Sequence, residues 1–407
     1  MTMPLPRIPI VDLCLTVTSG GTPSRKEPSF WDSGTIPWVK TGELSDWKIT
    51  KTAELITPQG LARSSAKVFA PGTVLMAMYG DGRTITTLGI VDTPCSSNQA
   101  CCAFVTNPRI CDSLYLFYAL RFHRKELLNL VVAGAQRNLS ISILKRFTVF
   151  YQPIERQLKI SSILSAYDHL IENNARRMQA LEANLQSLFD QTYVATETRS
   201  YRLGELLSSL ESGSRPRGGV SSEGEIPSIG AENVNGLAKH DFAKEKRISR
   251  AFFTAMKRGV VQNGDVLLYK DGAHIGRTAL AWSGYPHKEC AVNEHVFLLR
   301  PRSSIPSAFL YFYLARAEVK ERVRLLNTNS AQPGLNQAQV LGVRVEMPAP
   351  GKLSEFEQVA KPMLDLIFTL AKQQVTLRAA RDLLLPKLIS GEIDVGVAEE
   401  ALEAVAE

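Results

Sequence analysis

The strongest constraint on the fold of this chain is an internal duplication of its sequence. The run "GTVLMAMYGDGRT", which starts at Gly72, reappears as "GDVLLYKDGAHIGRT", which starts at Gly264. Further pairs in the same order are Ile36-Pro37 and Ile226-Pro227, Cys95 and Cys290, Asn98 and Asn293, Leu116–Arg121 and Tyr311–Arg316, and Gln136 and Gln332. The offset drifts only between 190 and 196 residues, which is typical of small loop insertions. The duplication predicts two copies of one fold, and 407 residues exceed one ordinary core.

Each copy begins with a mixed globular part. Short β-rich runs such as "AKVFAPGTVLMAMY" and "RTALAW" are interrupted by Gly and Pro, which predicts strands joined by turns. Helix-like segments, 113–130 and 307–326, follow at equivalent positions. We therefore expect a mixed α+β class, with the same α/β domain present twice.

Each copy ends in a long amphipathic segment, 157–191 or 355–389, without an internal glycine. Apolar residues recur three or four positions apart, which predicts one long helix in each copy. Residues expected to pair the helices or bind a partner are Tyr167, Leu170, Leu181, Leu185, Leu366, Leu370, Leu377 and Leu384. Two such helices can bury each other as an antiparallel coiled coil of roughly 50 Å, related by an approximate two-fold. The alternative is that each helix packs only on its own domain.

These patterns divide the chain into five parts. The expected boundaries are 1–155 for the first domain, 156–195 for the first helix, 196–353 for the second domain, 354–395 for the second helix, and 396–407 for a disordered tail.

Bulk properties narrow the class of protein. The net charge of +7 suits an acidic partner such as double-stranded DNA, but does not require one. No apolar run is long enough to span a bilayer, and the N-terminus does not resemble a signal peptide. The six cysteines form no pattern of paired CxxC motifs, so we expect core thiols in a reducing cytoplasm. The six histidines lack ligand spacing, and no metal site is expected.

Polar residues in the predicted loops recur at equivalent positions of both copies. Trp38 is expected to pack a turn that presents Lys40 and Thr41. Arg and Lys pair with guanine edges, and Asn and Gln with adenine edges. The candidate DNA contacts are Lys40, Thr41, Tyr79, Arg83, Asn98, Gln99, Gln136, Arg137, Asn138, Arg215, Arg217, Asn233, Lys270, His274, Arg277, Asn293, Asn329 and Gln332. Singly, such residues are more often turn formers or solvated charges.

Motifs for catalysis are missing from the sequence. There is no GxxxxGK[ST] phosphate loop, HExxH or GxSxG motif, and "TNPRI" differs from a methyltransferase Asn-Pro-Pro-aromatic loop at Arg109. We expect no catalytic residues and no cofactor in this chain.

The order of several sequence motifs along the chain resembles that of a known family. The order "GGTPS…FW…G-TIPWVKTGEL", then "NQACCAF", then "ERQLKISSILSAYDHLIENNARRMQALEANLQSLF", and finally "LRAARDLLLPKLISGEID" is similar to the specificity (S) subunit of type I restriction-modification systems. The resemblance covers residues 10–395. The second copy departs from the pattern where Ser228 replaces Trp38, so base contacts do not transfer simply between the copies.

The resemblance implies two target recognition domains separated by two antiparallel helices. It also implies a non-catalytic DNA-binding chain in a complex that methylates adenine at N6 and cleaves DNA. Two modification subunits would carry S-adenosylmethionine and flip out one adenine in each half-site. Restriction and translocase subunits would use ATP and Mg²⁺. Each domain would read one half of an asymmetric two-part site, and the helices would set the gap.

Two other functions stay open at this point. The chain could be a DNA- or protein-binding scaffold without base specificity, although it has no long Lys/Arg run to bind DNA by charge alone. It could also be a fused restriction-methylation enzyme, for which 407 residues without a cofactor loop leave little room.

Overall fold

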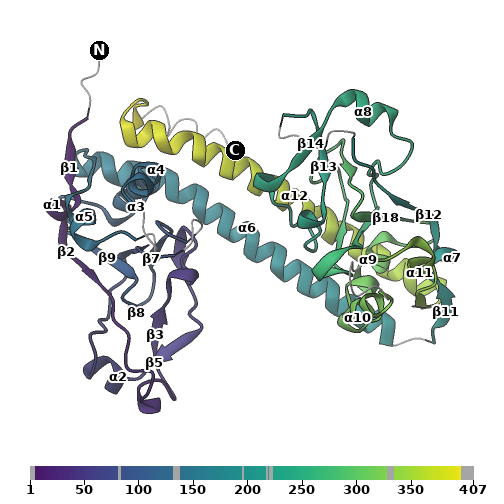
Figure 1. Ribbon diagram of the computed structural model, residues 1–407, viewed down its shortest axis with the longest axis horizontal. Coiled ribbons are helices and arrows are strands. Elements are labelled where there is room, and N and C mark those ends of the chain that lie inside the picture. The colour runs from purple at the N-terminus through teal and green to yellow at the C-terminus, as the bar shows by residue number, and fades with distance from the viewer. Residues whose placement is uncertain are drawn as a thin grey trace. The chain divides into compact units, whose positions relative to one another are not determined.

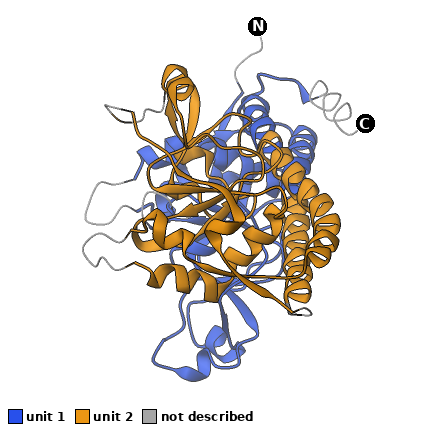
Figure 2. Cartoon of the chain, turned by 90° about the vertical axis from the view of Figure 1, so that its right-hand side faces the viewer, with its two compact units in different colours: residues 1–171, 377–407 blue, residues 172–376 orange. Residues whose placement is uncertain are grey.

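The computed structural model describes residues 5–80, 84–131, 138–194, 197–216, 219, 223–327 and 334–395 (Figure 1). The chain divides into two compact units, residues 1–171 with 377–407, and residues 172–376 (Figure 2). The unit boundaries fall inside two 41-residue helices, α6 (Ile154–Val194) and α12 (Pro350–Ser390). Each unit therefore consists of one globular domain and a part of both helices. The helices begin slightly earlier than the sequence predicted, and α12 ends at Ser390 rather than near residue 395.

The first domain contains, in chain order, β1 (Arg7–Pro9), α1 (Ile10–Leu13), β2 (Cys14–Ser19), η1 (Pro28–Phe30), β3 (Ile36–Val39), η2 (Thr41–Glu43), β4 (Trp47–Ile49), β5 (Glu54–Ile56), α2 (Pro58–Ala62), β6 (Val74–Ala77), β7 (Leu88–Val91), β8 (Ser96–Ser97), β9 (Cys101–Thr106), α3 (Ser113–Phe122), α4 (Arg124–Asn129), α5 (Ile141–Arg146) and β10 (Thr148–Phe150). Its sheets have the strand orders β2-β9-β6-β7-β4, β5-β3-β8 and β1-β10.

The second domain contains β11 (Arg199–Arg202), α7 (Leu203–Leu206), β12 (Leu207–Ser212), β13 (Ile226–Ile229), η3 (Ala231–Asn233), η4 (Phe242–Lys244), β14 (Lys246–Ile248), α8 (Arg250–Ala255), β15 (Val266–Tyr269), η5 (Gly272–His274), β16 (Thr278–Leu280), β17 (Ala291–Val292), β18 (Val296–Pro301), α9 (Ser307–Ala315), α10 (Ala317–Leu325), α11 (Gln337–Leu341) and β19 (Arg344–Met347). Its sheets have the orders β12-β18-β15-β16, β14-β13-β17 and β11-β19.

The sheet topology confirms the duplication. Each sheet of the second domain repeats the strand order of its counterpart, except that no described strand in it corresponds to β4. In both three-stranded sheets the central strand pairs antiparallel with one neighbour and parallel with the other. Trp38 pairs with Ser96 and Ser228 pairs with Ala291, so Ser228 occupies the place of Trp38.

The helix-like segments that follow the strands are each broken into two helices. In the first domain His123 ends α3 and begins α4, and in the second Arg316 separates α9 from α10 with extended backbone. The Arg316 guanidinium lies 4.2 Å from the centroid of the Tyr193 ring and pairs with Glu318. Seven consecutive residues of α9, 308–314, are buried, so this helix is surrounded by core. The prediction of one continuous helix in each copy is therefore wrong at these two residues.

In each unit the two long helices run antiparallel. In the first unit the Gln152 side chain, just before α6, donates to the Leu388 carbonyl at 2.9 Å, and Asp168 bonds Arg381. In the second unit the Asn174 amide donates to Gln373 at 3.4 Å, and Phe189 packs on Phe356 with ring centroids 6.2 Å apart. Contacts that lie later in α6 involve residues that lie earlier in α12, as expected for antiparallel helices. The helices also pack on their own domain, because the main core of each unit contains residues from the helices and from the sheets.

Most of the predicted pairing residues lie in these cores. Tyr167, Leu185 and Leu370 are buried. Leu181, Leu377 and Leu384 are partly buried against the cores. Leu170 and Leu366 are 48% and 37% exposed, so the prediction that they pair the helices is wrong. The next residues, Ile171 and Ile367, are buried in their place.

All six cysteines lie in the described ranges and are free, as the sequence predicted. Within those ranges, no helix combines the length and apolar character needed to cross a membrane.

Candidate nucleic-acid interface

In the first unit, polar residues gather where two parallel strands end together. β3 and β8 pair in parallel through Trp38–Ser96 and Val39–Ser97. The backbone N–H of Asn98 then donates to the Val39 carbonyl at 2.9 Å. Because both strands end at the same edge, Lys40 and Thr41 leave the sheet beside Asn98 and Gln99. The structure thus brings together four residues that the sequence placed in separate loops.

The loop after β2 crosses this edge at close range. A Cβ on Gly20 would lie 2.1 Å from the carbonyl oxygen of Ser97, so only glycine fits there. The next residue, Gly21, donates its N–H to the same carbonyl at 2.8 Å. The hydroxyl of Thr22 then bonds the side-chain oxygen of Gln99. Thr22 was not among the candidates from the sequence, although Ser19-Gly20 before it recurs as Ser212-Gly213 and indicates a turn.

Trp38 packs the turn behind this edge, as the sequence predicted. Its side chain is 3% exposed, and its indole N–H donates to the Gly21 carbonyl at 2.9 Å. Trp31 meets it edge-on at 5.0 Å, and the Arg25 guanidinium lies 3.6 Å from the Trp31 ring centroid. The tryptophans therefore support the fold of the turn, and the polar residues of the edge are the ones available to contact a ligand.

Tyr79 and Asn138 extend the same edge. The Met78 N–H donates to the Ala100 carbonyl at 2.8 Å, so Tyr79 follows directly beside the turn that carries Gln99. Tyr79 and Asn138 form an isolated bridge, and both are exposed. Lys40 lies 3.3 Å from Glu54, which also pairs with Arg25, so its charge is partly neutralised.

The second unit builds the same edge with β13 and β17. The Asn293 N–H donates to the Ile229 carbonyl at 3.0 Å, as Asn98 does to Val39. A Cβ on Gly213 would lie 1.6 Å from the Val292 carbonyl oxygen, which repeats the constraint on Gly20. The Lys270 N–H donates to the His295 carbonyl at 3.2 Å, and Asp271 bridges Gly334 in the place of the Tyr79–Asn138 bridge.

The side chains on this second edge are charged. Arg215 lies 3.8 Å from Glu294, and His295 bonds Asp271 at 2.9 Å. Lys270 also lies 3.5 Å from Asp271. The positions equivalent to Arg215, Glu294 and Asp271 carry the neutral residues Thr22, Gln99 and Tyr79 in the first unit. The two edges thus share a backbone but offer different donors and acceptors.

Three candidates of the second unit lie in other settings. Asn233 is 3% exposed, and its side-chain oxygen accepts from the Asp241 N–H at 2.8 Å. Because it is buried in a turn, the prediction that its side chain contacts DNA is wrong. Arg277 is exposed and donates to Asn235 at 3.0 Å. His274 is exposed at the end of η5.

Six candidate contacts fall outside the described residues. They are Arg83, Gln136, Arg137, Arg217, Asn329 and Gln332.

Comparison with known proteins gives consistent matches. The family described as "Type I restriction modification DNA specificity domain" matches residues 8–183. The type I restriction enzyme MjaIX specificity subunit of Methanocaldococcus jannaschii is 25% identical over 93% of this chain and 91% of its own length. The MjaVIII specificity subunit of the same organism is 19% identical over 70% of this chain and 72% of its own length.

A solved structure has the same fold. The S subunit of a type I restriction-modification system from M. genitalium matches with a TM-score of 0.64 and 16% sequence identity. The match covers 94% of this chain and 96% of that chain, so it includes both domains and both long helices.

Proposed function

The chain belongs to the family of type I restriction-modification DNA specificity subunits, and from this premise we propose how it reads DNA. Each recognition domain reads one half of an asymmetric, two-part site. α6 and α12 set the unread gap between the halves. The chain itself performs no chemistry.

One observation carries this proposal: the same strand-end edge occurs in both units with different side chains. A shared backbone supplies one docking geometry, and phosphate contacts fix such a geometry on the duplex. Sequence is read by the side chains that reach base edges. Gln99 suits adenine, whereas Lys270 and Arg215 suit guanine or phosphate, and Glu294 can accept from cytosine. Two unlike edges on one chain therefore fit two unlike half-sites.

We assign the chemistry to partner subunits. Two modification subunits that bind S-adenosylmethionine would flip out and methylate one adenine in each half-site. Restriction and translocase subunits would supply ATP- and Mg²⁺-dependent cleavage. Several apolar side chains of the helices are not buried by the helix pairing, which supports docking of partners on the helices. They are Leu158, Leu170 and Leu383 in the first unit, and Val359, Leu366 and Val375 in the second. A contiguous group of such side chains would mark a protein-binding surface.

Methylome sequencing tests the proposal directly. A host that expresses the chain with its modification subunit is expected to carry N6-methyladenine in one two-part motif with a fixed gap. The purified chain alone is expected neither to methylate nor to cleave DNA. Methylation scattered without a two-part motif would contradict base recognition and favour a scaffold without specificity.

A pair of variants assigns the halves. Gln99→Ala is expected to relax or abolish recognition of one half-site, and Glu294→Ala that of the other. Lys257→Ala, at an exposed lysine of the second unit outside the edge, is the control and should keep the motif. If both edge variants changed the same half-site, the assignment of one domain to each half would be wrong.

A further inference from the structure

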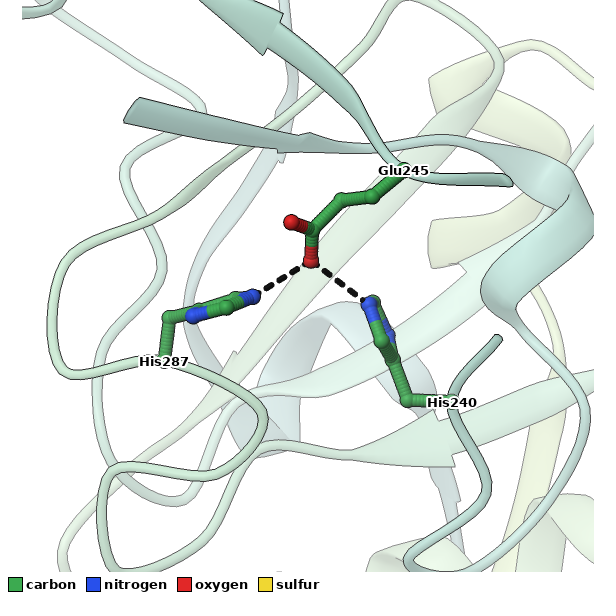
Figure 3. A group of neighbouring side chains, drawn as sticks. All are labelled: His240, Glu245 and His287. Carbon is green, nitrogen blue, oxygen red and sulfur yellow. Dashed lines mark hydrogen bonds and ion pairs between the residues drawn. The ribbon is translucent and has the colours of Figure 1, made fainter. Parts of the chain in front are cut away.

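Three side chains with metal-binding atoms meet inside the second unit (Figure 3). His240 precedes η4, Glu245 follows it, and His287 lies in the loop between β16 and β17. The Nε2 atom of His240 is 2.9 Å from Oε1 of Glu245, and Nε2 of His287 bonds the same oxygen. The three ligand atoms all lie within 4.8 Å of one another. The sequence predicted no metal site, because the histidines are far apart along the chain.

We propose that His240, Glu245 and His287 form a Zn²⁺ site. Two imidazole nitrogens and one carboxylate oxygen are ligands that zinc accepts, with a water in the fourth position. At metal–ligand distances of about 2.0–2.1 Å, tetrahedral ligand atoms lie roughly 3.3 Å apart. The Nε2–Oε1 distance of 2.9 Å therefore needs to open by only a few tenths of an ångström. The Nε2 protons move to Nδ1 or to solvent when the metal binds.

The surroundings of His240 and Glu245 favour the protonation states that a metal ligand needs. Burial lowers the pKa of His240 against the opposing effect of its hydrogen bond with Glu245, and the lowered pKa favours the neutral imidazole. Burial alone would raise the pKa of Glu245, but hydrogen bonds from His287 and His240 hold it below its usual value. The Glu245 carboxylate is therefore ionised. The Cys290 thiol is not among the ligand atoms that lie within 4.8 Å of one another, so the site has three protein ligands.

Neighbouring side chains hold the ligands in place. Arg247 donates to Oε2 of Glu245 at 3.1 Å, which leaves Oε1 for the metal. The Phe242 ring packs edge-on against both histidines, with centroids 4.6 Å from His240 and 5.7 Å from His287. Such outer partners orient the ligands of a metal site.

The metal would tie together the two segments that flank the recognition edge. Glu245 leads into β14, and the loop that contains His287 leads into β17. Both strands pair with β13, whose end forms the edge beside Asn293. The corresponding stretches of the first copy, 44–56 and 84–97, contain no histidine. The site therefore belongs to the second domain alone.

Metal titration of the full chain tests this inference. The protein is stripped with EDTA, dialysed, and titrated with Zn²⁺ in competition with a chromophoric chelator. We expect one equivalent to bind. Loss of an outer-shell partner typically costs about 10–100-fold in affinity, so His287→Gln should cost at least as much. His295→Gln is the matched control, because His295 is an exposed histidine bonded to Asp271 in the same unit. Equal Zn²⁺ affinity in wild type and His287→Gln, or no binding by wild type, would overturn the proposal.

Two further measurements separate a binding defect from misfolding. Circular dichroism of metal-free His287→Gln should match that of wild type, because His287 is partly exposed. Zn²⁺ should raise the melting temperature of wild type and of His295→Gln but not of His287→Gln. Co²⁺ on the unaltered wild type should give the intense visible bands of a tetrahedral ion. A weak octahedral spectrum would mean that the triad is only a hydrogen-bonded cluster.

Discussion

A buried ion pair joins the two long helices at one point in the first unit. Asp168 of α6 is 4% exposed and bonds Arg381 of α12, which is equally buried. The Tyr118 hydroxyl donates to the other carboxylate oxygen at 2.8 Å, and Arg121 lies 3.9 Å away. Both carboxylate oxygens of Asp168 are hydrogen-bonded, so the pair fixes helix register without leaving an uncompensated charge.

Removing one member of this pair should destabilise the first unit. Arg381→Met leaves Asp168 buried without its main cation, and we expect the free energy of unfolding to fall by about 3–5 kcal/mol. Urea unfolding of the full chain measures this loss. Arg176→Met is the control, because Arg176 is exposed on α6 and forms a surface ion pair with Glu172; it should change stability by less than about 0.5 kcal/mol. Adding Asp168→Leu to Arg381→Met should restore part of the loss, and equal effects of both arginine variants would contradict the role of the pair.

At the level of elements, each strand-end edge depends on a glycine that lets one loop cross another. Gly20 and Gly213 occupy equivalent positions, and each lies against the carbonyl of a residue in the parallel strand. The main chain cannot retreat without breaking the Gly21–Ser97 hydrogen bond in the first unit. The edge is therefore fixed by backbone packing, while its side chains are free to vary.

Alanine at either glycine should weaken the edge that it supports. A forced Cβ in a packed site costs about 1–3 kcal/mol or more, so Gly20→Ala and Gly213→Ala should each lower thermal stability and DNA affinity. Differential scanning calorimetry and binding to the methylated motif measure the two effects. Gly42→Ala is the matched control, since a Cβ there has no neighbour within 4 Å. A normal melting temperature and DNA affinity for Gly20→Ala would show that the loop has room to move.

The elements also show what sequence can and cannot predict. The duplication and the long helices were predictable, because repeat order and a three-to-four residue period are local properties of the chain. The breaks at His123 and Arg316 carry no Gly or Pro signal and depend on packing. The meeting of His240 with His287 depends on tertiary folding, so no spacing rule could find it. Leu170 and Leu366 were wrongly assigned to the helix pairing because each adjoins an isoleucine that fits the apolar stripe equally well, whereas their role in partner binding stays a prediction.

At the scale of the whole molecule, one chain carries two copies of the strand-end edge, and two continuous helices run through both units. Joining two readers makes the second binding event intramolecular, so edges of modest affinity can together give tight binding. Divergence of the side chains then makes the combined site asymmetric. In this view the helices determine the gap between the half-sites, so a change in helix length should change the length of the gap in the DNA motif.

Shortening both helices together tests this ruler. Residues 172–178 of α6 and 369–375 of α12 face each other in the antiparallel pairing, as the Asn174–Gln373 bond shows. Deleting both heptads shortens the helices by about 10 Å, or about three base pairs of DNA, and largely preserves the apolar stripe. Methylome sequencing is expected to show a gap shorter by about three base pairs. If the shorter gap rotates one half-site about the DNA axis beyond the reach of its domain, methylation is lost instead. Deleting 172–178 alone is the control, which should misalign the helices and lower stability. An unchanged gap in the double deletion would refute the ruler.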